Sequence, residues 1–197
     1  MDFLDLIKKN RSYRSFDESV SISKDTLLSF VECARLSASA ANRQPLKFFI
    51  SSDKETNALI QSTTAWAAKL RPGRILPDPG HYPTAFIVIC VDKQILPDAA
   101  KADRDLGIAA QSILLSAVSQ GFGGIMIGAF SKNVKDLLGL EERYEPALII
   151  ALGKPDETII LEDSAESIDY YRDENDVHHV PKRRLEDIVI EKRDTHE

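Results

Sequence analysis

The stretch DRDLGIAAQSILLSAVSQGFGGIMIG, residues 103–128, predicts a long helix that leads directly into a strand. Its apolar residues keep the helical period from Leu106 to Val118, and Gly121 ends the pattern. Apolar side chains cover much of the circumference, so we expect this helix to be buried in the core or in a subunit interface. The glycine-bearing segment that follows predicts a turn and a strand.

Other segments complete a layered domain. Residues 85–91 are apolar at every position, which is typical of a central strand covered on both faces, and residues 147–152 predict a second buried strand. Long helices interspersed with a few buried strands predict an α+β or α/β fold. The remaining patterns predict a strand at 47–50, helices near 3–10, after Ser23, after Asp53 and after a capping Ser131, and a hairpin around 173–176.

Bulk properties narrow the class of protein. The chain has 197 residues and a net charge of −6, which predicts a single domain and argues against nonspecific nucleic-acid binding. No apolar run approaches the roughly 20 residues that span a bilayer, and the N-terminus does not resemble a signal peptide. Cys33 and Cys90 lack metal or redox spacing. We therefore expect two buried free thiols in a cytoplasmic protein with no membrane partner.

Two basic clusters lie near opposite ends of this acidic chain. The first contains Arg11 and Arg14, and the second is Lys182-Arg183-Arg184. Guanidinium groups form forked hydrogen bonds to phosphate. One hypothesis is that both clusters are solvated surface, which is usual for short charge runs. The other is that the chain ends meet in the fold and hold one phosphate between them.

The glycine segment 121–128 does not match a dinucleotide fingerprint. Met126 stands where the third glycine would fall, and a strand follows in place of a helix. Two interpretations remain: a turn with a strand, or a backbone that a flat ligand approaches closely. Asn42 and Gln44, beside Pro45, are likewise either an ordinary turn or hydrogen-bonding groups for a ligand.

No set of residues suggests a metal centre or a protein nucleophile. His178 and His179 are adjacent, so on a strand they point to opposite faces and cannot both bind one ion. The histidines, cysteines and acids form no recognisable catalytic signature. Ligand-binding groups without a nucleophile are typical of an enzyme whose cofactor carries the chemistry.

In order and spacing, these motifs together resemble the nitroreductase family of flavin mononucleotide (FMN) enzymes over nearly the whole chain. The matching segments are NRSYRSF at 10–16, SAANRQP at 39–45, DLGIAAQ at 105–111, GFGGIMIG at 121–128, ALGKP at 151–155 and KRR at 182–184. The resemblance implies an α+β fold in which helices flank a central, mostly antiparallel sheet. It also implies one domain over 1–197, with a variable loop or lid near 64–83 and a C-terminal hairpin extension over 156–180.

The same resemblance implies a homodimer with FMN at the subunit interface. Arg11, Ser12 and Arg14 would hold the phosphate and ribityl end, joined by the C-terminal basic residues, and the backbone of Gly128 would lie near flavin N5. No protein residue would be catalytic, because flavin N5 carries the chemistry. The implied cofactor-binding residues are Arg11, Ser12, Arg14, Ser39, Asn42, Gln44, Met126, Ile127, Gly128, Lys182 and Arg184.

The implied reaction is hydride transfer from NADH or NADPH to FMN, followed by reduction of an organic acceptor such as a nitroaromatic or a quinone. Gly128 stands where some relatives carry glutamate, and the 64–83 stretch is short for the family. Because of these departures, the sequence does not identify the electron acceptor. Two alternatives remain: a flavin-binding or flavin-sensing protein without NAD(P)H turnover, and a phosphate-ligand binding protein of unrelated fold.

Overall fold

The computed structural model describes residues 2–66, 76–164 and 166–190. The chain forms two compact units, residues 1–68 with 73–156 and residues 69–72 with 157–197. Residues 67–75 of the expected loop or lid over 64–83 lie outside the described residues. Among the described residues, no helix is long and apolar enough to cross a membrane.

An antiparallel sheet of five strands forms the first unit. The expected central strand is confirmed, because β3 pairs with β2 on one side and β5 on the other and is buried along its whole length. Strand β5 is longer than the buried run at 147–152 and also pairs with β1 and β4. The strands are β1 (Phe16–Asp17), β2 (Leu46–Ser51), β3 (Ala85–Asp92), β4 (Gly123–Ile127) and β5 (Tyr144–Pro155).

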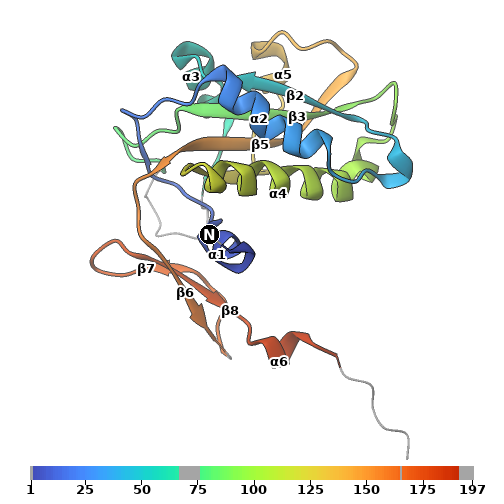
Figure 1. Cartoon of the computed structure of the whole chain (residues 1–197). Coiled ribbons are helices and arrows are strands. Elements are labelled where there is room, and N and C mark those ends of the chain that lie inside the picture. The colour runs from blue at the N-terminus through green and yellow to red at the C-terminus, as the bar shows by residue number, and fades with distance from the viewer. Residues whose placement is uncertain (1, 67–75, 165, 191–197) are drawn as a thin grey trace, which may run out of the picture. The chain divides into compact units, whose positions relative to one another are not determined.

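Helices cover both faces of this sheet, as the α+β expectation requires (Figure 1). Alternate β3 side chains point to opposite faces. Ile87 and Ile89 pack with α2 and α4, whereas Phe86 and Val88 pack with residues of α3 and α5. The helices of this unit are α1 (Phe3–Lys9), α2 (Lys24–Arg35), α3 (Lys54–Thr63), α4 (Asp103–Ser119) and α5 (Val134–Leu137), with single turns η1 (Ala40–Asn42) and η2 (Ala99–Ala102).

Two of the three expected helix caps are confirmed. Ser23 Oγ accepts from the N–H of Thr26 at 3.1 Å, and Asp53 Oδ1 accepts from that of Thr56 at 2.8 Å. The prediction that Ser131 caps a helix is wrong, because α5 begins two residues later than a Ser131 cap would require. Its N-cap is Asn133, which makes no side-chain capping bond.

The expectation of two buried thiols holds for one cysteine only. Cys90 lies in β3, and burial raises the pKa of its thiol to about 12. Cys33 is exposed. Helix α2 buries the side that carries Leu27, Phe30 and Ala34, and Cys33 lies about 100° around the helix from Ala34.

The second unit is a small sheet with β8 in its centre. Strand β8 (His178–Lys182) pairs in parallel with β6 (Ile159–Asp163) and antiparallel with β7 (Tyr171–Arg172), and α6 (Leu185–Ile188) follows. The hairpin expected around 173–176 is confirmed. Its turn is held by the Asp173 carboxylate, which accepts from the N–H groups of Asn175 and Val177, both at 2.9 Å.

One histidine ties the three strands of this unit together. The His179 ring stacks on Tyr171 at 4.6 Å between centroids. Its Nδ1 lies 2.5 Å from Glu162 Oε1, and its Nε2 lies 3.3 Å from Asp173 Oδ2. Two carboxylate acceptors favour the doubly protonated ring. Accordingly the pKa of His179 is raised above 6.5, with the Glu162 hydrogen bond as the largest cause.

We expect the small sheet to lose stability as pH rises through the folded-state pKa of His179. A raised folded-state pKa contributes stability that is fully present below the unfolded value and is lost as pH rises through the folded value. An NMR titration should place the His179 transition above 6.5, with Tyr171 signals changing along the same curve. His179→Phe keeps the stacking and should abolish that titration in Tyr171. A His179 transition below the ordinary value would contradict the expectation.

Candidate functional site

The N-terminal basic segment lies along β4. Ser12 forms a parallel bridge with Gly124, and the N–H of Tyr13 donates to the Gly124 carbonyl at 3.1 Å. The Tyr13 ring lies over Gly123, where a Cβ would come within 2.6 Å of Tyr13 Cδ2. The fold therefore brings two motifs, separated by more than 100 residues in the sequence, into direct contact.

Backbone carbonyls orient both arginines of this segment. Arg14 is 8% exposed, and its Nη1 donates to the Ser12 carbonyl at 3.0 Å. Arg11 Nη2 donates to the Ile7 carbonyl of α1 at 2.9 Å. Burial lowers the pKa of the Arg11 guanidinium from its ordinary value, but a guanidinium remains charged near neutral pH. Arg11 Nε is buried with no hydrogen-bond partner among the described residues, which leaves a donor available for an anion.

The glycines of residues 123–128, in β4 and directly after it, have two different roles. A Cβ on Gly124 would lie 2.4 Å from the Ala151 carbonyl oxygen, so protein atoms already fill that space. The space beside Gly123 is filled in the same way by the Tyr13 ring. At these two positions the glycines serve packing, and the hypothesis that they admit a flat ligand is wrong there. Gly128 differs, because a Cβ would meet no atom within 4 Å.

The end of β4 presents an accessible edge. Met126 is 38% exposed, whereas Ile125 and Ile127 on either side are buried. This follows from the alternation of side chains along a strand. Gly128 directly follows the strand and is exposed. A planar ligand could therefore lie against Met126 and the backbone at Gly128 without displacing a side chain.

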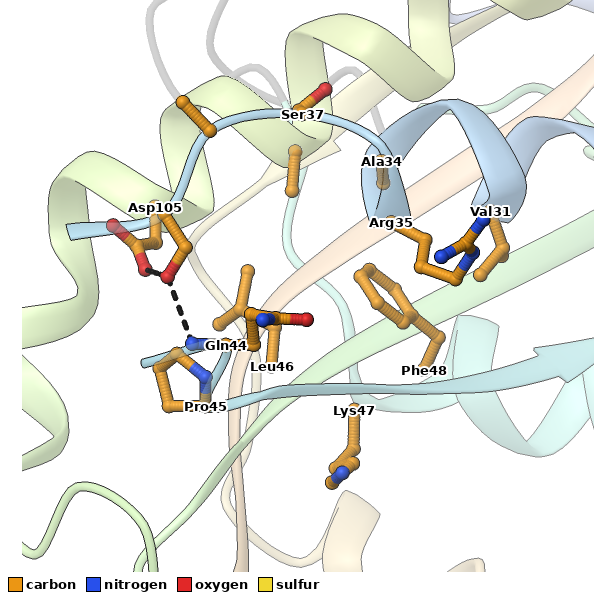
Figure 2. Close-up of a pocket in the computed structure, with 13 residues that line it drawn as sticks. Val31, Ala34, Arg35, Ser37, Gln44, Pro45, Leu46, Lys47, Phe48 and Asp105 are labelled. Atoms are coloured by element: carbon orange, nitrogen blue, oxygen red, sulfur yellow. Dashed lines mark hydrogen bonds between the residues drawn. The ribbon is translucent and has the colours of Figure 1, made fainter. Parts of the chain in front are cut away.

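A second group of expected site residues lies in the loop 39–44. Asp105 in the first turn of α4 accepts from Ser39 Oγ at 2.6 Å and from the Ala40 N–H at 3.0 Å. Ser39 Oγ in turn accepts from the Gln44 N–H at 2.9 Å. A cavity of about 330 Å³ is lined by the two ends of this loop, Ser39 at its start and Gln44 at its end (Figure 2). Val31, Phe48 and Ala109 provide apolar parts of its lining.

These two groups contact α4 at different positions within one chain. The loop contacts Asp105, near the first residue of the helix, whereas Asn10, next to Arg11, donates to Gln111 Oε1 near the middle of the helix at 3.3 Å. Asp105 and Gln111 are six residues apart in the sequence, which corresponds to about 9 Å along the helix axis. The C-terminal residues Lys182 and Arg184 are exposed and belong to the second unit. Their convergence with Arg11 stays a prediction.

Sequence reasoning missed one residue of this arrangement. Asp105 was part of a matching motif but not an expected site residue, although it is 5% exposed and holds the 39–44 loop. Its sequence signal was an acidic residue next to the buried stripe that begins with Leu106. A charge on the inner side of a helix normally requires partners, since burial of an unpaired charge is costly.

Taken together, the fold and this site define an α+β protein in which two oriented arginines lie beside the strand that leads to Gly128. The family model described as "Nitroreductase family" matches residues 7–154. The chain belongs to the nitroreductase family.

Known relatives agree with this assignment. A Bacillus subtilis protein provisionally named as an NAD(P)H nitroreductase is 26% identical over 188 residues, covering 78% of this chain and 88% of the relative. The NADPH:FMN oxidoreductase of Vibrio harveyi, solved with NAD⁺, is 25% identical, with a TM-score of 0.60 and coverage of 78% and 69%. A nitroreductase family protein from Streptococcus pneumoniae has a TM-score of 0.69 at 23% identity, covering 98% and 100%.

Proposed function

We propose that this protein is a flavin-dependent oxidoreductase that binds FMN, uses NADH or NADPH as the electron donor and reduces an organic acceptor. The observation that carries the proposal is the pairing of the Arg11–Arg14 segment with β4, which is directly followed by the open Gly128. That arrangement offers an anion site and a flat, accessible edge on neighbouring backbone. Support also comes from the Vibrio harveyi relative, which is named for the same donor and cofactor types.

The residues present fit a phosphate-bearing flavin. Arg11, Ser12 and Arg14 offer a charged, hydrogen-bonding end, and Arg11 Nε still lacks a partner among the described residues. The exposed Lys182 and Arg184 would add positive charge to the same phosphate. Met126 and Gly128 would line the ring, with the Gly128 N–H as a donor near N5. Ile127 would contribute only its backbone, because its side chain is buried in the core. When bound, FMN supplies the two-electron chemistry that no side chain here provides.

We also propose that the active form is a homodimer. Ser39, Asn42 and Gln44 lie in a loop held by Asp105, apart from the arginine segment, and in this proposal the loop of one copy and the arginine segment of the other meet one flavin. Apolar side chains with high exposure support a buried interface. Phe3 and Leu4 of α1 are 71% and 59% exposed, and Ile108 of α4 is 42% exposed.

The acceptor is proposed only as a class, a nitroaromatic, a quinone or a similar compound. Gly128 carries no side chain and has free space beside it, so its position does not restrict the acceptor by size. An exposed Met126 provides an adaptable apolar contact on the same side.

Anaerobic reduction of the purified protein tests this function. We expect a yellow protein whose flavin absorbance is bleached by NADH or NADPH and returns on addition of a quinone or a nitroaromatic. A colourless protein that takes up no added FMN would refute the proposal. A flavin that stays oxidised with both donors would favour a flavin-binding or flavin-sensing role without turnover.

A further inference from the structure

The loop 39–44 has an unusual backbone. Ala41, Asn42 and Gln44 have φ values of 51°, 52° and 51°, so three non-glycine residues adopt the left-handed conformation within four positions. L-residues disfavour this region because Cβ comes close to the carbonyl oxygen. Such a backbone persists only where surrounding contacts impose it, and it is commonly found where a ligand is bound.

Packing of the loop against other side chains does not impose this backbone conformation. The cavity of about 330 Å³ is lined by Ser39 at the start of the loop and by Gln44 and Pro45 at its end, and residues 40–43 do not line it (Figure 2). Ala41 and Asn42 are exposed on the outer side. The middle of the loop is therefore exposed, and the hydrogen bonds at its two ends set its shape.

Those hydrogen bonds converge on Asp105. Its two carboxylate oxygens accept from Ser39 Oγ at 2.6 Å and from the Ala40 N–H at 3.0 Å, which fixes the start of the loop. Ser39 Oγ accepts from the Gln44 N–H at 2.9 Å, which fixes its end. The position of Asp105 in the first turn of α4 favours a carboxylate, because the helix N-terminus carries partial positive charge.

In this conformation of the loop, the side-chain amides of Asn42 and Gln44 are hydrogen-bonded to each other. Gln44 Nε2 donates to Asn42 Oδ1 at 3.0 Å, so each side chain restricts the other. Both residues are exposed. Their remaining donors and acceptors, the Asn42 Nδ2 group and Gln44 Oε1, are of the types that match a ligand edge that alternates carbonyl and N–H groups.

We propose that Asp105 is a positioning residue that holds the 39–44 loop so that Asn42 and Gln44 are preorganised for the ring edge of a bound ligand. This inference rests on the proposed function, in which that ligand is FMN. An aspartate is needed because both donors point at it. Asparagine would offer one acceptor oxygen and turn an NH₂ toward a donor. Asp105→Glu keeps two acceptors and should partly restore the loop.

Asp105→Asn provides the test, with Asp103→Asn as a matched control. Asp103 lies in the same turn of α4, is exposed and loses the same charge. Hydrogen exchange should show the Ala40 and Gln44 amides exchanging about tenfold faster in Asp105→Asn, with little change in the control. FMN release should be about tenfold faster, and the visible bands of bound FMN, which report hydrogen bonds to the ring, should shift.

The possible outcomes distinguish a failure of the positioning role from a failure of the proposed function. If Asp105→Asn does not fold, Ser39→Ala removes the link between Asp105 and the Gln44 N–H. It should give the faster Gln44 exchange and the same changes in FMN release and spectrum, whereas Ala40 keeps its bond to Asp105. Unchanged exchange, or faster exchange with unchanged FMN release and spectrum, overturns the positioning role while flavin binding stands. A wild-type protein that binds no FMN overturns the proposed function and the ligand role together.

Discussion

Gly124→Ala is expected to lower the free energy of unfolding by about 3 kcal/mol or more. The added Cβ would lie 2.4 Å from the Ala151 carbonyl oxygen and 2.9 Å from methyl groups of Leu114 and Leu152. The first contact is with backbone in the centre of a paired strand, which cannot rotate away. Relief requires β4 to move off β5 or α4, and equilibrium urea unfolding monitored by circular dichroism measures the cost.

Gly107→Ala is the matched control, with an expected effect of opposite sign. Gly107 lies in the first half of α4 and is exposed, and a Cβ added there would meet no atom within 4 Å. Replacing glycine by alanine in a helix interior stabilises by about 0.5–1 kcal/mol. If the two substitutions changed the unfolding free energy equally, the close packing at Gly124 would not be what makes glycine necessary there.

Arg11→Ala and Arg184→Ala should each raise the dissociation constant for FMN by about 10- to 100-fold. Each variant removes a guanidinium that we propose contacts the phosphate, and hydrogen bonds between charged groups contribute about 1.5–3 kcal/mol. Titration of FMN, followed by quenching of its fluorescence, measures the constant. Lys54→Ala is the control, because it removes one exposed positive charge from α3 and should have little effect.

The double variant tests whether the two ends of the chain share one phosphate. Groups that contact the same ligand atoms are coupled, so the combined loss should differ from the sum of the single losses by about 0.5 kcal/mol or more. Additive losses would indicate two independent contacts. Unchanged FMN affinity in both single variants would leave the basic clusters as solvated surface and refute the clamp.

Local patterns were sufficient to predict most of the fold. The continuous apolar run in β3 and the helical period in α4 identify these elements without knowledge of their partners. Caps such as Ser23 and Asp53 act within one turn, which is why they could be predicted. The burial of Cys33 was predicted wrongly, because a single apolar neighbour in the sequence does not specify which side of α2 faces the sheet.

The geometry of the candidate site depends more than the fold does on contacts between segments that are distant in the sequence. The motif around Arg11 and the β4 glycines were each recognised, but the sequence does not show that Tyr13 occupies the space above Gly123. Nor does it show that Asp105 closes the 39–44 loop from another element. These relations arise from side chains that are far apart in the chain, so no local pattern contains them.

The sequence by itself determined the element order, the buried central strand, the long helix and the likeness to nitroreductases, because periodicity and motif spacing are properties of the chain. Only the tertiary structure decided what each glycine and each polar group does. Gly124 is required by a neighbouring strand, Gly128 has free space, and Asp105 holds a loop with three left-handed residues. The physical reason is that packing and hydrogen bonding depend on distances between atoms, which the fold sets and the order of residues does not.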